Sequence, residues 1–397
     1  MRSNESINVK GVQRLNRLCV VNLIRKNGSA VRSDIGKYSG LSPAAISGIV
    51  SYLMNIGLVV ESGVENVERT GRKGVILRFC SSRYTILTAG CDNDELLRVS
   101  LTDLSGEVIA QKECRIAGMD GESITAQLCA NAEALLRLPE AQRVIAIGLS
   151  VSGMVLDHGE NVLSAAVPWN LPAIRSRLKK LRDVPVLVSN STFTKANWLC
   201  RGSMNEEKGL SVFVDLSGGI GAAVLQDGAR LSAVAGEIGQ TIVAKGDPED
   251  GEKRGWLETM CSPKRLLRLY HARSGKTVSD MASFSALLAQ GDSAASEALE
   301  ECAEYLGCGL ANLVALFDPQ KMMINAFDYA DCPQMVARAL EVMRSRLYRG
   351  IGKNLHVEVL CFRDRDFVSA MAQELCDSLF SEQLPVDVFA LMDEIAQ

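Results

Sequence analysis

Small and hydroxyl side chains line one face of a predicted helix near the N-terminus. The segment over residues 42–55 is apolar at helical spacing, so its opposite face is expected to be open to solvent. Side chains of this size let a helix approach base edges in the major groove of DNA. Those expected to begin the helix or to face outward are Ser42, Ala44, Ser47, Ser51 and Tyr52. The pattern predicts a surface that reads DNA sequence.

A basic, glycine-rich segment lies further along, between two predicted strands. Residues 69–74 read Arg-Thr-Gly-Arg-Lys-Gly and contain Arg72 and Lys73 as candidate DNA contacts. The glycines would let the backbone lie close to a surface, where the cations could meet phosphates or the minor groove. The alternative is a solvated hairpin turn, because a charge cluster of this size is more often simply a solvated surface.

The distribution of charge favours the DNA-binding interpretation. Residues 1–80 hold 12 Lys and Arg against 5 Asp and Glu, whereas the remaining residues hold 31 against 42. The chain as a whole is acidic, with a net charge of −4. A basic N-terminal module on an acidic body is typical of a DNA-binding head attached to a regulatory domain.

The elements that would position these residues form a winged helix-turn-helix over residues 1–80. A short helix is predicted from residue 32, and a turn at residues 39–41 leads to Ser42 as an N-cap and Pro43 at the first helical position. A helix over residues 12–25 would complete the core, and strands over 57–61 and 75–79 would flank the wing. The face expected to be buried carries Ile46, Ile49, Val50 and Leu53.

Length and composition indicate an ordinary folded protein. The chain has 397 residues, enough for two or three domains, and 47% of them are hydrophobic. No apolar run approaches the roughly 18 residues that span a bilayer, and the N-terminus does not lead into a signal peptide. We therefore expect a cytoplasmic location without membrane insertion. The 12 cysteines include no C-x-x-C pair, which favours reduced, buried thiols over disulfides or a metal site.

The rest of the chain repeats one structural plan. Three strands separated by polar turns are predicted over residues 85–92, 97–102 and 107–112, and the same order recurs over residues 210–215, 220–225 and 229–233. Helical segments follow each group. We expect an α/β fold with two similar lobes, over residues 84–195 and 196–380, and a ligand-binding cleft between them.

A helix is also predicted within the C-terminal tail, residues 381–397. Its apolar side chains, Val388, Leu391, Met392 and Ile395, fall on one side. This helix would pack on the DNA-binding head or on a partner subunit, or it would be a frayed terminal helix; the sequence does not distinguish these outcomes.

Short motifs run through the body in a fixed order. They are Ile145–Val155, Pro168–Asn170, Val188–Asn190, Ser217–Ala222, Asp227–Gly228, Ala235–Gly239 and Gly255–Glu258. This series resembles the ROK family, which contains bacterial sugar kinases and sugar-responsive repressors of the NagC and Mlc type. The winged helix-turn-helix resembles the repressor branch specifically. The resemblance covers essentially the whole chain and implies a two-lobed body like those of actin and hexokinase.

The resemblance also implies a set of sugar-binding residues. The positions that bond sugar hydroxyls in the family correspond here to Asn170, Asn190, Glu237, Gln240 and Glu258. Carboxylates accept hydrogen bonds from hydroxyls, while amides both donate and accept, which suits a polyol. The alternative for Glu237 and Glu258 is that they cap helices or lie on turns.

Four positions depart from the pattern of the family's kinases. The Asn-Asp pair that supplies the catalytic base is Asn190-Ser191 here, and serine cannot act as that base near neutral pH without a partner. The first phosphate loop is replaced by residues 92–96, which are rich in carboxylates. Gly218 stands where the second loop has Thr, and Asn325-Ala326 replaces Gly-Gly near the adenine end. These departures predict that the chain is not an enzyme.

The zinc site of the family is also expected to be lost. Gln240 stands at the position of its histidine, residues 246–254 contain no cysteine, and Trp256 stands at the last cysteine position. Because a structural zinc needs about four N or S ligands, we expect no metal and no cofactor. The acidic residues around Pro248 could be imagined as a cation loop, but they are more typical of a solvated turn.

Together these features predict a sequence-specific transcriptional regulator. Its partners would be double-stranded DNA, a sugar or sugar phosphate bound in the cleft, and further copies of itself in a homodimer or homotetramer. The expected targets are genes of sugar uptake or catabolism, under repression. Two alternatives stay open: an ATP-dependent sugar kinase that carries a head domain, and a regulator controlled by a protein partner with a vestigial sugar cleft.

Overall fold

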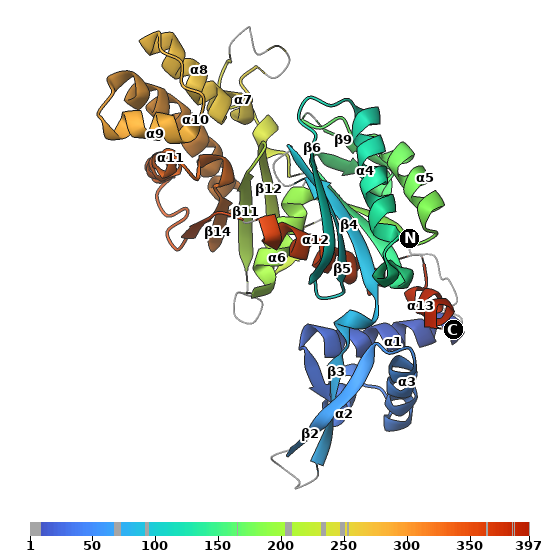
Figure 1. The fold of residues 1–397 in the computed structure, drawn as a ribbon. Coiled ribbons are helices and arrows are strands. Elements are labelled where there is room, and N and C mark those ends of the chain that lie inside the picture. The colour runs from blue at the N-terminus through green and yellow to red at the C-terminus, as the bar shows by residue number, and fades with distance from the viewer. Residues whose placement is uncertain are drawn as a thin grey trace.

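The computed structural model consists of a small N-terminal head below a body of two lobes (Figure 1). It describes residues 9–66, 73–91, 95–164, 166–202, 209–231, 236–246, 251, 254–362, 364–382, 384 and 386–396. Within these residues no helix is long and apolar enough to cross a membrane.

The head has the predicted helix-turn-helix. It contains α1 (Val9–Lys26), α2 (Arg32–Ser39) and α3 (Pro43–Asn55) with the strands β1 (Ser29–Val31), β2 (Val59–Asn66) and β3 (Lys73–Phe79). Gly40 ends α2 in a left-handed conformation, and the Ser42 hydroxyl accepts a bond from the Ala45 N–H at 3.3 Å at the start of α3. The strands pair in the order β1-β3-β2. Strand β1 was not predicted, because a run of three residues carries no recognisable period.

The described strands of the first lobe form a sheet in the order β10-β7-β4-β5-β6. They are β4 (Thr85–Cys91), β5 (Leu96–Asp103), β6 (Val108–Arg115), β7 (Val144–Val151) and β10 (Val186–Asn190). Strands β4, β5 and β6 are antiparallel neighbours, whereas β4, β7 and β10 run parallel. Helices α4 (Gly121–Leu136) and α5 (Leu171–Leu181) cover one face, and β8 (Met154–Leu156) pairs with β9 (Asn161–Leu163) beside it.

The second lobe repeats this topology, as the sequence predicted. Its sheet has the order β13-β12-β11-β14-β15, with β11, β12 and β13 antiparallel and β11, β14 and β15 parallel. The strands are β11 (Leu210–Leu216), β12 (Ile220–Gln226), β13 (Ala229–Arg230), β14 (Lys321–Asn325) and β15 (His356–Leu360). Its helices are α7 (Leu257–Cys261), α8 (Pro263–Ser274), α9 (Met281–Ala289), α10 (Ser293–Phe317) and α11 (Pro333–Arg346).

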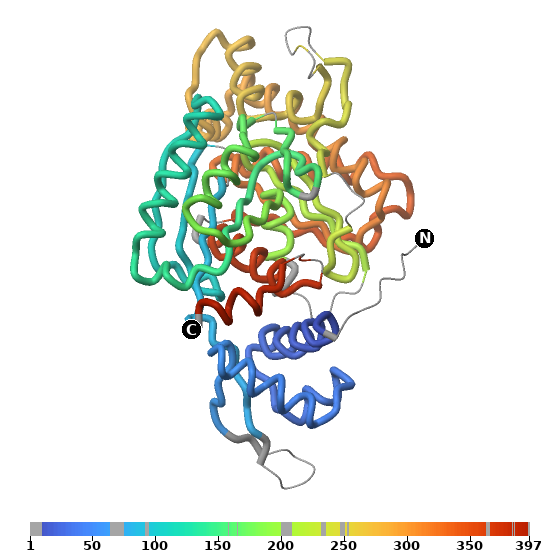
Figure 2. Tube along the Cα trace, turned by 90° about the vertical axis from the view of Figure 1, so that its right-hand side faces the viewer, coloured from blue at the N-terminus to red at the C-terminus, as the bar shows by residue number. Residues whose placement is uncertain are grey.

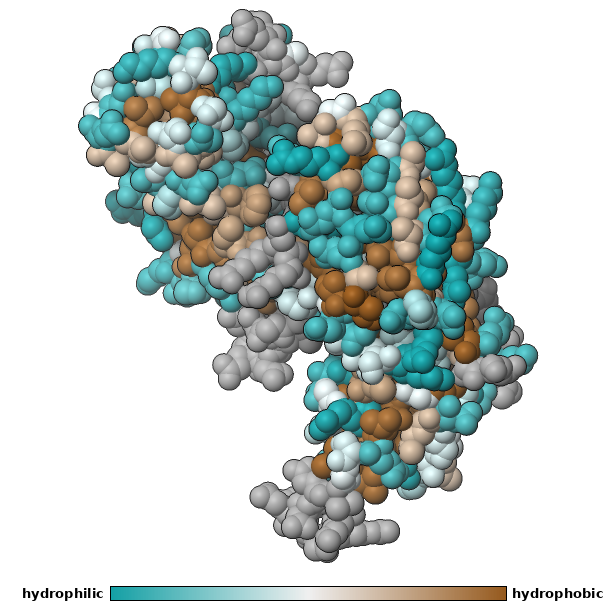
Figure 3. All heavy atoms as spheres, in the orientation of Figure 1, coloured by the Kyte–Doolittle hydropathy of each residue, from teal (hydrophilic) through white to brown (hydrophobic). Residues whose placement is uncertain are grey.

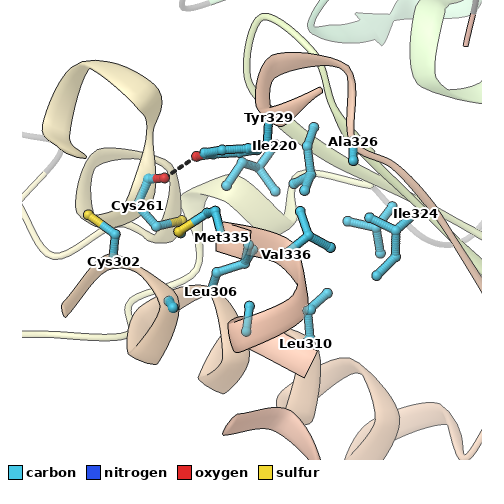
Figure 4. Packing of buried hydrophobic residues seen from close by; sticks show 14 of the residues in the cluster. Ile220, Cys261, Cys302, Leu306, Leu310, Ile324, Ala326, Tyr329, Met335 and Val336 are labelled. Carbon is cyan, nitrogen blue, oxygen red and sulfur yellow. Dashed lines mark hydrogen bonds between the residues drawn. The ribbon is translucent and has the colours of Figure 1, made fainter. Parts of the chain in front are cut away.

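A continuous apolar core joins these helices to the second sheet. Leu306 and Leu310 of α10, Met335 and Val336 of α11 and Ile324 of β14 meet there (Figure 4). On the outer surface, apolar side chains gather low on the first lobe, above the head (Figure 3). Nearby, β6 exposes Val108 and Ile109.

Two helices cross the expected boundary between the lobes. Helix α6 (Ser191–Gly202) spans residues 195 and 196, where we placed the boundary, and contacts strands of both sheets. Helix α12 (Asp364–Leu379) was expected in the second lobe but packs on β4, β5 and β7 of the first. Gly90 and Gly148 allow this approach, because a Cβ atom on them would lie 2.8 Å from Met371 Sδ and 3.0 Å from Leu375 Cδ2.

The C-terminal helix α13 (Val388–Ala396) lies against the head (Figure 2). Buried residues of α1 and α3 share one apolar cluster with Phe380 and with Val388, Phe389 and Met392 of α13. Of the alternatives that the sequence left open for the tail, packing on the head is the one observed. The same cluster contains Ile86 and Ile145 of the first lobe, so the head, the tail and this lobe form one packed unit.

Candidate functional site

A polar cleft lies where the two lobes and α6 meet. It is lined from the first lobe by Ser152 and Gly153, from the start of α6 by Ser191 and Thr192, and from the second lobe by a glycine turn over residues 217–221. Four of the five predicted sugar-binding residues also line it: Asn190, Glu237, Gln240 and Glu258. The fold thus brings together residues as distant in the chain as Ser152 and Glu258, which are 106 positions apart.

Asn170 lies elsewhere. It is exposed and caps α5, where its Oδ1 accepts a bond from the Ala173 N–H at 3.2 Å. The indole of its neighbour Trp169 donates to the hydroxyl of Ser152 at 3.5 Å, so the segment borders the cleft without adding Asn170 to the lining. A helix-capping role was not considered for Asn170 in the sequence, although Pro follows it at the second helical position.

Asn190 connects two backbone segments that border the cleft. Its Nδ2 donates to the Gly153 carbonyl at 2.7 Å and its Oδ1 accepts from the Phe193 N–H at 3.1 Å. The side chain is 8% exposed. Asn190 therefore joins the end of β10 to the β7–β8 turn and positions Ser191 and Thr192 at the start of α6.

The two glutamates face the cleft and do not cap their own helices. Glu237 Oε2 accepts a bond from Gln240 Nε2 at 3.1 Å, and Glu258 Oε2 accepts from the Ile220 N–H at 3.4 Å, across the cleft wall. Burial, together with the neighbouring charge of Glu258, raises the pKa of the Glu237 carboxyl, while the bond from Gln240 partly opposes this shift. Neither carboxylate caps its own helix, and ligand binding by the two residues stays a prediction.

The glycine turn is packed tightly against Glu258. A Cβ atom at Gly219 would lie 3.1 Å from Glu258 Oε2, and one at Gly239 would lie 2.6 Å from the Ile220 carbonyl oxygen. Gly218 has a φ of +69° and donates its N–H to Asp328 Oδ2 at 3.0 Å. Only glycine fits these positions without displacing the backbone or the carboxylate.

A buried ion pair below the turn was missed by the sequence reasoning. Lys195 Nζ on α6 donates to Asp215 Oδ2 at 2.9 Å and to the Ser217 hydroxyl at 2.6 Å, and the two side chains are 2% and 4% exposed. Asp215 Oδ1 accepts further bonds from Ser217 and from Asn325 Nδ2, at 2.8 and 2.7 Å. Asn325, noted only as a departure from the kinase pattern, thus ties β14 to β11. Lys195 and Asp215 stand in unremarkable sequence surroundings, so no local signal pairs them.

The predicted DNA-reading residues of α3 lie on an open face. Ser42, Ala44, Ser47 and Ser51 are exposed. Lys73 is the first residue of β3, and Arg72 lies outside the described residues. These residues remain predicted contacts.

The outward orientation expected for Tyr52 was wrong. Its hydroxyl donates to Asp393 Oδ2 of α13 at 2.9 Å, its ring meets Phe389 edge-on, and the Arg17 guanidinium lies 3.5 Å from the ring centroid. Burial and the bond to Asp393 raise the pKa of the Tyr52 phenol well above its usual value. Helical periodicity places Tyr52 on the flank of α3 but cannot reveal that a distant helix covers that flank.

Further polar contacts hold the head to the body. Arg25 forms an ion pair with Asp377 of α12 at 2.5 Å, and Asn22 Nδ2 donates to the Phe380 carbonyl at 2.8 Å. The buried Tyr84 hydroxyl, at the start of the first lobe, donates to the Ile56 carbonyl at 2.8 Å and approaches the Met392 carbonyl at 3.4 Å. Contacts from α1, α3, α12 and α13 therefore converge at one junction.

The described residues include no group of three or more His, Cys, Asp or Glu that could hold a metal ion. At the family's zinc positions, Gln240 is bonded to Glu237 and Trp256 precedes α7. Residues 247–250, 252 and 253 lie outside the description, so the loss of zinc stays a prediction. Among the described cysteines, those at 91, 261, 302, 332 and 376 are buried, whereas Cys19 and Cys361 are exposed.

A winged helix-turn-helix fused to two lobes of matching topology around a polar cleft defines a DNA-binding regulator with a ligand-binding body. The ROK family profile matches residues 95–371, and the chain belongs to the ROK family. With its DNA-binding head, it is a transcriptional regulator of the repressor branch.

Similar proteins cover nearly the whole chain. The xylose repressor of Caldicellulosiruptor bescii is 24% identical over 93% of this chain and 97% of its own length. The DNA-binding transcriptional repressor Mlc of Escherichia coli is 24% identical over 81% of this chain and 83% of its own. A crystal structure of a ROK family transcriptional regulator homologous to Mlc has a TM-score of 0.74 at 22% identity, covering 97% of this chain and 99% of that one.

The body alone has the fold of sugar kinases. A ROK hexokinase from Thermus thermophilus has a TM-score of 0.58 at 24% identity, over 73% of this chain and 97% of the kinase chain. At this identity the similarity establishes the shared fold only, so the chemistry must be argued from the residues of the cleft.

Proposed function

We propose that the protein represses genes for the uptake or catabolism of a sugar, and that this sugar binds in the cleft. The observation that carries the proposal is the convergence of Asn190, Glu237, Gln240 and Glu258 on one cleft, in a chain whose head exposes the DNA-reading face of α3. Carboxylates and amides placed together match the alternating donors and acceptors of a polyol. The relatives named as xylose repressors make D-xylose the first sugar to test.

We further propose that the body is not a kinase. Ser191, at the position of the kinase base, carries a hydroxyl that cannot take a proton from a sugar near neutral pH without a basic partner. Among the described carboxylates of the cleft, Asp215 is held by Lys195, while Glu237 and Glu258 are bonded to Gln240 and Ile220. The protein would work in the cytoplasm, where bacterial DNA lies, as a homodimer or homotetramer that reads paired half-sites.

Two helices support a route by which the sugar would control the head. Helix α6 begins at the cleft with Ser191 and Thr192. It is bonded to α12 through Asn197 Nδ2 and Glu374 Oε2 at 2.6 Å, and Lys195 Nζ lies 5.6 Å from the ring centroid of Phe367 on α12. Helix α12 then reaches the head through Asp377 and Arg25. Closure of the cleft on a sugar would move α6 and α12 and favour a head arrangement with lower DNA affinity.

Isothermal titration calorimetry tests the binding part of this proposal. We expect one of D-xylose, D-glucose and N-acetyl-D-glucosamine to bind the full chain, and Glu258→Gln to weaken that binding by about 10-fold or more, as for loss of a hydrogen bond to a charged group. Glu122→Gln, which alters an exposed ion pair with Arg177, is the matched control and should bind like the wild type. Absence of binding by every sugar, or wild-type affinity in Glu258→Gln, would contradict the proposal.

A further inference from the structure

The glycine turn over residues 217–221 has the composition of a phosphate-binding turn, but two of its N–H groups are already engaged by carboxylates of the protein. Consecutive backbone N–H groups in a glycine-rich turn form a concave anion site when they are free. Here the Gly218 N–H donates to Asp328 Oδ2 at 3.0 Å, and the Ile220 N–H donates to Glu258 Oε2 at 3.4 Å. Two carboxylates of the chain therefore take up N–H groups that an anionic ligand would use: Glu258 from within the cleft lining, and Asp328 from outside that lining.

These carboxylates are fixed in place by the core behind them. Asp328 lies in the short helix Phe327–Tyr329, and Glu258 lies in the first turn of α7. The buried hydroxyl of Tyr329 donates to the carbonyl of Cys261 at the end of α7, a bond visible in Figure 4. Because this bond joins the two short helices, Asp328 and Glu258 are anchored as a pair and are not readily displaced by a phosphate.

The charges around the cleft also disfavour an anionic ligand. Glu237 and Glu258 line it together with Asp215, whose charge is compensated by Lys195, whereas no Lys or Arg is among the lining residues that the structure describes. The ammonium of Lys195 below the turn is engaged by Asp215 and Ser217. The Arg230 guanidinium lies over the ring of Phe193, 4.3 Å from the centroid, and Arg230 itself is not among the lining residues. A phosphate or carboxylate in the cleft would thus face net negative charge at short range.

We propose that the effector of this regulator is an uncharged, hydroxyl-rich molecule, and that the carboxylate-capped turn excludes sugar phosphates and nucleotides from the cleft. This inference rests on the proposed function, because it assigns the chemical class of the ligand for the same site. Hydroxyl groups can donate to Glu237 and Glu258 without adding charge, whereas a phosphate can only accept. Selection therefore comes from unfavourable interactions with the wrong ligand as well as from bonds to the right one.

Calorimetry with matched pairs of ligands tests the proposal. The pairs are D-xylose and α-D-xylose 1-phosphate, D-glucose and glucose 6-phosphate, and N-acetyl-D-glucosamine and its 6-phosphate, each titrated into the full chain. We expect the neutral member of one pair to bind and its phosphate to bind at least 100-fold more weakly. A phosphate that binds as tightly as its neutral partner, or more tightly, would overturn the inference while leaving the proposed sugar site intact. Binding by no ligand of either kind would overturn both.

Variants of the glycine turn test whether its two bonded carboxylates cause the exclusion of phosphates. Asp328→Ala frees the Gly218 N–H and removes a charge, so the ratio of phosphate to neutral-sugar dissociation constants should fall at least 10-fold. Glu258→Gln provides a second variant, since it removes a charge without shortening the side chain. Because this variant also weakens the neutral sugar, we expect the ratio to fall and the phosphate itself to bind more tightly than it binds the wild type. The control Glu122→Gln removes an exposed charge from the first lobe and should keep the wild-type ratio. Wild-type ratios in both Asp328→Ala and Glu258→Gln would refute the role of the capped turn.

Discussion

Replacement of Lys195 by Met is expected to destabilise the protein strongly. Lys195 and Asp215 are 2% and 4% exposed, and the ammonium is the only cation bonded to Asp215 among the described contacts. Met fills a similar volume but leaves the carboxylate in a dry environment with only neutral donors. Removing one partner of a buried pair costs about 3–5 kcal/mol, mostly because the remaining charge is uncompensated. Since Ser217 and Asn325 still donate to Asp215, we expect a value near the lower end, about 3 kcal/mol.

A double variant, Lys195→Met with Asp215→Asn, separates the effect of lost packing from the effect of the unpaired Asp215 charge. Adding Asp215→Asn to Lys195→Met removes the unpaired charge, so the free energy of unfolding of the double variant should be about 1–2 kcal/mol higher than that of Lys195→Met. The effects of the two single substitutions would then not add, as expected for residues in contact. Urea unfolding followed by tryptophan fluorescence measures this, and the exposed Lys180→Met serves as the control for loss of a lysine. A cost below about 1 kcal/mol for Lys195→Met, or strict additivity in the double variant, would refute the account of a dry, paired site.

Three further predictions concern the cleft and the head. Glu237→Gln should raise the melting temperature of the sugar-free protein at pH 7.5, because a carboxyl whose pKa is raised in the folded state destabilises the fold when it is ionised. The difference in melting temperature between variant and wild type should disappear as the pH falls through the raised pKa towards 4.5. A difference that does not depend on pH would contradict this prediction. Ser47→Glu should weaken DNA binding at least 10-fold in fluorescence anisotropy without shifting the melting temperature, since Ser47 is exposed; unchanged affinity would exclude this face of α3 from DNA contact. Tyr52→Phe should lower the free energy of unfolding by about 1–2 kcal/mol through loss of the bond to Asp393, and wild-type stability would argue against a tight contact of α3 with α13.

Local signals in the sequence were sufficient for much of the fold. The start of α3 could be predicted because Ser42 and Pro43 mark a helix N-terminus regardless of what packs around it. The two lobes could be predicted because the strand and turn pattern after residue 84 recurs after residue 210, and the observed strand orders match. Both inferences depend on residues close together in the chain.

Features set by contacts between distant segments could not be predicted in the same way. The hydrogen bond from Tyr52 to Asp393 joins residues 341 positions apart, and the bond from the Gly218 N–H to Asp328 joins residues 110 positions apart. The site was predicted from family motifs that included Asn170 with Glu237, Gln240 and Glu258. The last three line the cleft, whereas Asn170 caps α5, because a motif does not state whether a polar residue faces the ligand or caps a helix.

The most direct test of the account is whether a bound sugar changes DNA affinity through the body. Fluorescence anisotropy of the labelled upstream region of the protein's own gene should be followed at constant salt while the sugar identified by calorimetry is added. We expect the dissociation constant for DNA to rise at least 10-fold in the wild type. In Glu258→Gln, the sugar concentration needed for half of this rise should be about 10-fold or more higher. A dissociation constant for DNA that is unchanged in the wild type, at sugar concentrations that saturate the cleft, would contradict the account.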